Sequence, residues 1–361
     1  MPAPVEAGTP RPWQQLLPLL RPLLTVGGAL VAGAIPLLLL RVNPLAAYWS
    51  FLSGSLGNFY GMSEVVVKTI PLIFTGLAVA LPLRAGLWNI GAEGQLYMGA
   101  FAASGVALAA LSGNYPAWLL LPALTVMGAL AGAVWGFIPG LLRARLGVSE
   151  IITTLMLNYL AILWADYLIY GPWRDPGGFN FPLTAVFPKA AWLPRYPGTR
   201  AHAGLILALL VAVLIYFIFT RTKLGFELKF VGANPQAAEL GGISQAKLTL
   251  WVLAAGGALA ALAGVGEVSA VQHRLRPGIS PSYGYTGIAV ALLGKSHPLG
   301  VILAAAFFGI LAVGGSFLQQ TKFPTLFGSG TVQVPVAIVE ILQALVILFI
   351  IGGELLTRAK H

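Results

Sequence analysis

The chain has 361 residues, of which 58% are hydrophobic and only 9% are charged. A typical soluble domain is about 25% charged, so this composition excludes a compact soluble fold with a large polar surface. The formal net charge of +10 is carried by dispersed cations, which disfavours nucleic-acid binding and is typical of the loops of a membrane protein.

About ten apolar segments are predicted to cross a membrane as helices, because they carry few charges and most are long. In chain order they are residues 20–41, 64–83, 92–111, 117–141, 150–170, 203–221, 248–270, 283–294, 299–318 and 330–352. The short segment 283–294 could instead be a half-helix or a re-entrant segment, and the long segment 117–141 indicates a tilted span. We therefore predict an all-α integral membrane protein with about ten transmembrane helices.

An even number of spans places both termini on the same side of the membrane. With the N-terminus in the cytoplasm, 12 of the 21 Lys and Arg residues fall in cytoplasmic loops and nine fall outside. Four of those nine lie in the long loop 171–202, which counts less. This orientation predicts a cytoplasmic tail at residues 1–19, a polytopic transmembrane domain at 20–352 and a second cytoplasmic tail at 353–361. The long, Pro-rich first tail is not typical of a cleaved signal peptide.

The outer loop 171–202 is rich in proline and aromatic residues. Trp173, Trp192 and Tyr196 are expected at the lipid interface, where aromatic side chains of this kind gather. A plain connector and a surface for docking a partner remain equal interpretations of this loop.

The cytoplasmic loop 222–247 contains the signals of a short helix. Asn234 suits the N-cap, Pro235 suits the first turn, and Gly241 and Gly242 suit the end. A helix of about two turns is marginal by itself, so packing against another protein would order it. An ordinary surface loop is the alternative.

Polar side chains in the apolar spans recur at helical spacing and form three predicted stripes. The stripes are Glu150, Thr154, Asn158 and Asp166; Gln333, Glu340 and Gln343; and Asn89, Glu93 and Tyr97. Polar groups are costly inside a membrane, so the stripes favour a lined solute pathway; hydrogen bonding between helices is the alternative. Glu93 is also expected to cap helix amides or to brace a glycine-rich bend. Amides and carboxylates suit a neutral, hydroxyl-rich solute, whereas a phosphorylated solute would call for an Arg cluster.

Enzyme and metal-site signatures are not found in the sequence. The chain has no cysteine and four scattered histidines, so we expect neither disulfides nor a metal site. Gly294-Lys295-Ser296 is similar to the end of a phosphate-binding loop, but six residues lie between Gly287 and Gly294 where the motif needs four. We therefore expect no nucleotide binding, no cofactor and no catalysis by this chain.

Several sequence blocks resemble the permease subunits of ATP-binding cassette (ABC) importers. Gly232-Ala233-Asn234-Pro235, followed by Ala237-Ala238 and Gly242-Ile243, is similar to the coupling-helix loop of these subunits. The block from Arg84 to Gln95 (RAGLWNIGAEGQ) is similar to the signature of the nucleoside branch, which is related to the ribose and branched-chain amino-acid permeases. The blocks 287–295, 297–300 and 340–345 match the same branch. The resemblance extends over most of the chain, from about residue 64 to about residue 352.

The resemblance implies a type II-importer-like permease fold and a pore-forming subunit for a nucleoside in the bacterial cytoplasmic (inner) membrane. It implies three protein partners: an ABC ATPase that uses the ATP, a second and related permease chain, and an extracytoplasmic substrate-binding lipoprotein. The expected ATPase-coupling residues are Gly232, Asn234, Pro235, Ala237, Ala238, Gly242 and Ile243. The expected substrate-pathway residues are Asn89, Glu93, Gln95, Thr154, Asn158, Glu340 and Gln343.

Other classes of protein remain as alternatives. One is an ABC permease for a simple sugar such as ribose; a second is an ion-coupled secondary transporter, for which Glu340 is the best carboxylate; a third is a membrane enzyme or scaffold. A docking helix in the loop 222–247 favours the ABC permease, because a secondary transporter does not need one. The opposite topologies of spans two to five and seven to ten also allow two inverted four-helix repeats.

Overall fold

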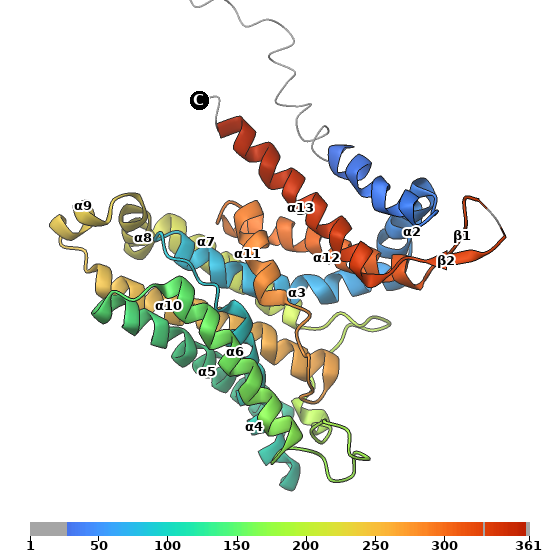
Figure 1. Cartoon of the computed structure of the whole chain (residues 1–361). Coiled ribbons are helices and arrows are strands. Elements are labelled where there is room, and N and C mark those ends of the chain that lie inside the picture. Colours follow the sequence, from blue (N-terminus) through green and yellow to red (C-terminus); the bar gives the residue numbers. More distant parts are fainter. Residues whose placement is uncertain (1–26, 328, 359–361) are drawn as a thin grey trace, which may run out of the picture. The chain divides into compact units, whose positions relative to one another are not determined.

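The computed structural model describes residues 27–327 and 329–358, and nearly all of its regular structure is helical (Figure 1). The chain divides into two compact units. The larger unit is Asn58–Ala312, and the smaller unit consists of the described parts of Met1–Gly57 and Val313–His361. The predicted tail 1–19 lies outside the described residues.

The larger unit contains most of the predicted spans. Its helices are α3 (Phe59–Leu83), α4 (Ala92–Ala109), α5 (Ala117–Leu146), α6 (Glu150–Tyr170), α7 (Gly204–Arg221), α8 (Lys223–Ala233), α9 (Pro235–Leu240), α10 (Gln245–Gly266), α11 (Tyr283–Leu293) and the first part of α12 (Pro298–Gln320). Two short 3-10 turns, η1 (Ala110–Ser112) and η2 (Lys189–Ala191), and a π-helical turn, η3 (Glu267–Gln272), complete it. The helix α8 was not predicted; Thr222 caps it by accepting a hydrogen bond from the Gly225 amide.

Seven helices of the described chain are long and apolar enough to cross a membrane. They are α3, α4 with η1, α5, α6, α7, α10 with η3, and α12. Shorter apolar helices at Gly27–Leu39, Tyr283–Leu293 and Val336–Phe349 occupy the other three predicted spans. The multi-pass architecture is confirmed at this level, and the count of ten and the inverted repeats stay predictions.

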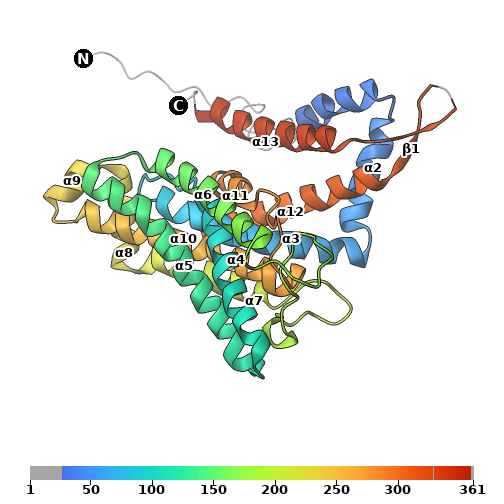
Figure 2. The same cartoon turned by 60° about the horizontal axis from the view of Figure 1, so that its bottom comes forward.

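Small residues bring the central helices of the larger unit into close contact. On α5, Gly128, Gly132 and Gly136 recur every four residues and face α10, so that a Cβ atom added to Gly132 or Gly136 would collide with a carbonyl oxygen of α10. Figures 1 and 2 show α5 and α10 running side by side. Such close approach of backbones is how membrane helices gain packing energy without a hydrophobic driving force between them.

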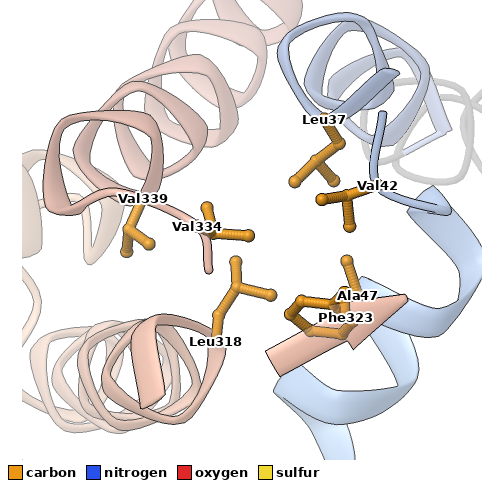
Figure 3. Packing of buried hydrophobic residues seen from close by; sticks show 7 residues of the cluster. All are labelled: Leu37, Val42, Ala47, Leu318, Phe323, Val334 and Val339. Carbon is orange, nitrogen blue, oxygen red and sulfur yellow. The ribbon is translucent and has the colours of Figure 1, made fainter. Parts of the chain in front are cut away.

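The smaller unit is built around an apolar cluster at the C-terminal end of the helix Gly27–Leu39. It contains α2 (Pro44–Leu56), the end of α12, the strands β1 (Lys322–Pro324) and β2 (Thr331–Gln333), and α13 (Val336–Arg358). Figure 3 shows its core side chains turned toward one another: Leu37, Val42, Ala47, Leu318, Phe323, Val334 and Val339.

Two predictions fail in the smaller unit. The strands pair in antiparallel fashion, with Phe323 opposite Val332, so the fold is not purely α-helical. Gln333 belongs to β2, and α13 begins only at Val336. The predicted helical stripe of Gln333 with Glu340 and Gln343 is therefore wrong, because the Gly-rich stretch before it favours a hairpin turn.

Candidate functional site

The turn that leads into α4 is held by a pair of buried amide side chains. Asn89 donates to the Gln95 side-chain oxygen (2.9 Å), and Gln95 donates back to the Asn89 oxygen (3.0 Å). Asn89 also donates to the Ala78 carbonyl of α3 (3.1 Å). Asn89 lies before the first residue of α4, so it does not continue a helical stripe with Glu93 and Tyr97 as predicted. Its contacts fasten α3 to the start of α4.

Asn158 of α6 serves as the missing cap of α4. The residue before α4, Gly91, has no side chain to bond the first amides of the helix, which have no partner within it. Asn158 accepts a hydrogen bond from the Gly94 amide (2.7 Å) and donates to the Ile90 carbonyl (2.9 Å) and, more weakly, to the Tyr285 hydroxyl (3.3 Å). One fully buried amide thereby joins α4, α6 and α11.

Glu93 caps the N-terminus of α11 in a similar way. Its carboxylate accepts a hydrogen bond from the Gly284 amide (2.7 Å), and the Ser280 hydroxyl accepts one from the Tyr283 amide (3.0 Å). A carboxylate at a helix N-terminus also interacts favourably with the helix dipole. The prediction that Glu93 caps helix amides is confirmed, and the capped helix is the short one in the predicted span 283–294.

We expect Asn158→Leu to destabilise the protein by about 3 kcal/mol, because it leaves the buried Gly94 amide and Ile90 carbonyl without partners. Thr154→Val is the matched control on the same helix. The Thr154 hydroxyl bonds only to carbonyls of its own helix, at Glu150 and Ile151, so this change should be close to neutral. Unfolding of each variant in detergent measures the difference; equal stabilities would contradict the capping role of Asn158.

At the same end of α11, polar side chains of α3 and η3 meet Tyr283, the first residue of α11. Lys68 of α3 donates to the Tyr283 hydroxyl (3.1 Å). Glu267 of η3 is only 4% exposed and lies near Lys68, Tyr283 and Gln272. The sequence did not indicate that Lys68 and Glu267 lie near each other, because they come from elements far apart in the chain.

The loop 171–202 packs against the same region. The Leu193 amide bonds the Ser269 carbonyl (3.0 Å), the Phe187 amide bonds the His273 carbonyl (2.9 Å), and the Trp192 ring stacks on His273 at 3.8 Å between centroids. The loop is therefore an ordered cap on η3 rather than a free connector.

His202, at the end of this loop, is 1% exposed, and its Nδ1 accepts a hydrogen bond from the Gly204 amide (3.2 Å). Burial, with smaller contributions from Arg195 and His273, lowers the pKa of His202 from 6.5 to about 4. The folded protein therefore favours the neutral form of His202. The stability that depends on neutral His202 is fully present above pH 6.5 and is lost as the pH falls toward 4.

We expect acidification from pH 7 to pH 4 to weaken the attachment of this loop by about 3 kcal/mol. Protection of the amides of residues 185–203 against hydrogen exchange, relative to their intrinsic exchange rate at each pH, should fall over this range. His202→Asn keeps an acceptor without a titrating ring, so its protection should depend much less on pH. Identical pH profiles for the two proteins would show that His202 does not control the loop.

At the opposite end of the larger unit, α8 and α9 form a projecting pair (Figures 1 and 2). The predicted short helix is confirmed as α9: Asn234 caps it by accepting from the Ala237 amide (3.0 Å), Pro235 is its first residue, and Gly242 follows with a φ of +79°. Ala238 is fully buried, whereas Leu240 is 92% exposed. Ala238, one of the expected coupling residues, therefore supports the segment from within, whereas Leu240, which was not among them, is its exposed apolar side chain.

The base of this segment touches the turn before α4. A Cβ atom at Gly232 would collide with the Arg84 carbonyl, and Gly86 faces Gly232. Farther along the turn, the Trp88 amide points to the Glu150 carboxylate (3.4 Å), which also pairs with Arg143 (3.4 Å). Contacts thus run from the projecting segment to the turn that Asn89 and Asn158 hold.

The last two expected pathway residues lie in the smaller unit, on α13. Glu340 is exposed, and Gln343 is half-buried. No three His, Asp or Glu side chains come together as a metal site within the described residues.

Comparison with known proteins identifies a matching protein family and several relatives. The model of the permease component of branched-chain amino acid transport systems matches residues 61–351. The chain is 44% identical to the glucose ABC transporter permease protein TsgB13 of Haloferax volcanii, covering 94% of this chain and 88% of that protein. It is 36% identical to the guanosine ABC transporter permease protein NupP of Bacillus subtilis (93% and 94%). It is 34% identical to the nucleoside ABC transporter permease protein NupB of Lactococcus lactis (91% and 89%).

Proposed function

The chain belongs to the family of permease components of branched-chain amino acid transport systems, and on this premise we propose that it forms the pathway of an ATP-driven importer for a nucleoside. The observation that carries this proposal is the match of nearly the whole chain to permeases for guanosine and nucleosides. As an ABC permease it is a non-catalytic membrane subunit, and a partner subunit hydrolyses the ATP.

A simple sugar is the second candidate solute. The glucose permease of Haloferax volcanii is more similar in sequence than the guanosine permease, at 44% against 36% identity. Nucleosides and sugars are both neutral and hydroxylated, in agreement with the polar side chains of the larger unit. Membership of an ABC family removes the support for an ion-coupled transporter.

We propose that α8 and α9 dock on the ATPase. The exposed Leu240 provides an apolar anchor, and the capped ends of α9 hold it in one conformation. Because Gly232 packs on the Arg84 backbone, a displacement of this segment would push the turn before α4. Asn158 and Glu93 would then pass that movement to α6 and α11.

The remaining assignments follow from this role. We propose a bacterial inner-membrane location with both termini in the cytoplasm, a second and related permease chain, and an extracytoplasmic binding lipoprotein. Asn89, Glu93, Gln95 and Asn158 are proposed to shape the solute pathway through their hydrogen bonds, and Thr154 through its place on the same face of α6 as Asn158. Glu340 and Gln343 of α13 are retained as proposed pathway residues.

Reconstituted transport tests the proposal. The chain is co-expressed with an ATPase, a second permease and a binding lipoprotein of the same organism, and uptake of radiolabelled guanosine and glucose into proteoliposomes is measured. We expect ATP-dependent uptake of guanosine that unlabelled nucleosides inhibit. Uptake that persists with a hydrolysis-deficient ATPase, or uptake of neither solute, would overturn the proposal.

A further inference from the structure

An acidic side chain near the C-terminal end of an apolar helix has no partner among the described residues. Asp166 lies in α6, one of the helices long enough to cross a membrane, and is half-exposed. It makes no hydrogen bond or ion pair with any residue that the structure describes. A carboxylate at this position is costly against lipid, so it faces either a partner protein or a water-filled pathway.

Asp166 belongs to a stripe along one flank of α6. Leu155, Tyr159, Ile162 and Asp166 follow one another at intervals of four, three and four residues, so they share one side of the helix. Tyr159 is 57% exposed. The stripe lies beside the buried face of α6 that carries Asn158. It is therefore next to the hydrogen bonds by which Asn158 joins α6 to α4 and α11.

A second tyrosine reaches the same place from α11. Tyr285 is half-exposed, and its hydroxyl accepts the hydrogen bond from Asn158 (3.3 Å). Tyr159 follows Asn158 directly in the chain, so Tyr285 lies near it, and Asp166 lies near the buried Tyr97. Asn158 and Tyr97 thus form the ordered base over which Tyr159, Asp166 and Tyr285 lie.

We propose that Tyr159, Asp166 and Tyr285 form a contact face for the transported solute, and that this solute is a neutral nucleoside rather than a nucleotide. The inference rests on the proposed transport function. Two tyrosine rings offer apolar faces to a base, as aromatic side chains do in nucleic-acid sites. The Asp166 carboxylate accepts hydrogen bonds from ribose hydroxyls. The helices α4, α6 and α11 contain no Lys or Arg, so a phosphate would meet the negative charge of Asp166 without a cation to offset it.

Single-cysteine labelling tests this face directly, because the natural chain has no cysteine. The variants Tyr159→Cys and Asp166→Cys are each assembled with the partner subunits and treated with a membrane-impermeant maleimide. Labelling of this chain is followed by mass spectrometry. Tyr167→Cys is the matched control: Tyr167 is also on α6 and 62% exposed, but it lies off the stripe and stacks on Trp164.

We expect both stripe variants to react and the control to react little, since the control faces lipid. Guanosine at twice its dissociation constant should slow the stripe reactions about threefold, and guanosine 5′-monophosphate should leave them unchanged. In uptake, Asp166→Asn should lower guanosine transport about tenfold while the ATPase still co-purifies.

The outcomes separate two failures. If the natural chain takes up guanosine but the stripe variants are unreactive, a second subunit or lipid covers the face and this inference is wrong. Labelling that guanosine does not slow, or that the nucleotide slows equally, also overturns it. If the natural chain takes up neither guanosine nor glucose, the proposed transport function is wrong, and the solute-contact face that rests on it is wrong as well.

Discussion

Leu240→Arg is expected to detach the ATPase from the complex and to abolish ATP-driven uptake, while the membrane domain keeps its fold. Leu240 ends α9 and is 92% exposed, so the charge creates no clash and breaks no contact inside the chain. An exposed apolar side chain at the tip of a short, capped helix is typical of an interface anchor, and loss of such an anchor costs about 2 kcal/mol or more. A buried, unpaired cation at the docking site would add to that cost.

Co-purification of the ATPase and ATP-driven uptake measure this effect. Leu240→Met keeps an apolar side chain and should retain both. Ala238→Leu is a less direct probe, because Ala238 is fully buried and a larger side chain would disturb α9 itself. If Leu240→Arg keeps its ATPase and its uptake, then α9 does not dock there.

Gly284→Ala is expected to have the second large effect, a loss of about 3 kcal/mol in stability together with loss of uptake. A Cβ atom at Gly284 would collide with the backbone of Glu93. Backbone cannot rotate away as a side chain can, so α11 would have to move as a whole. That movement would break the hydrogen bond from the Gly284 amide to the Glu93 carboxylate, which supplies the cap of α11.

Gly266→Ala is the matched control in the same unit. A Cβ atom there would lie 3.8 Å from the His202 ring, which is an ordinary contact. Because the position is helical, alanine should be neutral or stabilising by up to about 1 kcal/mol. The thermal midpoint in detergent and guanosine uptake distinguish the two variants. A melting temperature of Gly284→Ala equal to that of the natural chain would mean that α11 is not packed on the start of α4.

Some of the site followed from local sequence alone. Asn234 followed by Pro235 placed the start of α9, and Gly241-Gly242 placed its end, because capping chemistry depends on neighbouring residues. The helix α8 beside it was missed, since Lys223–Ala233 combines polar and apolar residues without a strong period. In the same way, α2 was missed because Pro44–Leu56 is too short for a span.

Most roles of the polar side chains could not be predicted. Asn158 was assigned to a pathway from helical spacing, and the structure shows that it caps α4 across a distance of 64 residues in sequence. Spacing identifies the face of a helix but not what that face meets. Asp166 has the same periodicity as Asn158, yet it was not selected, because only the packing of α4, α6 and α11 distinguishes a satisfied amide from an unpartnered carboxylate.

The sequence by itself determined that this chain is a multi-pass membrane protein and an ABC permease. Its scarcity of charge leaves no surface for a soluble fold, and its long apolar segments must be helices because lipid cannot satisfy backbone hydrogen bonds. Tertiary structure alone decided which polar groups cap helices, which form ionic links and which have no partner among the described residues. Those roles depend on contacts between residues far apart in the chain, and no local sequence pattern indicates which of these residues meet.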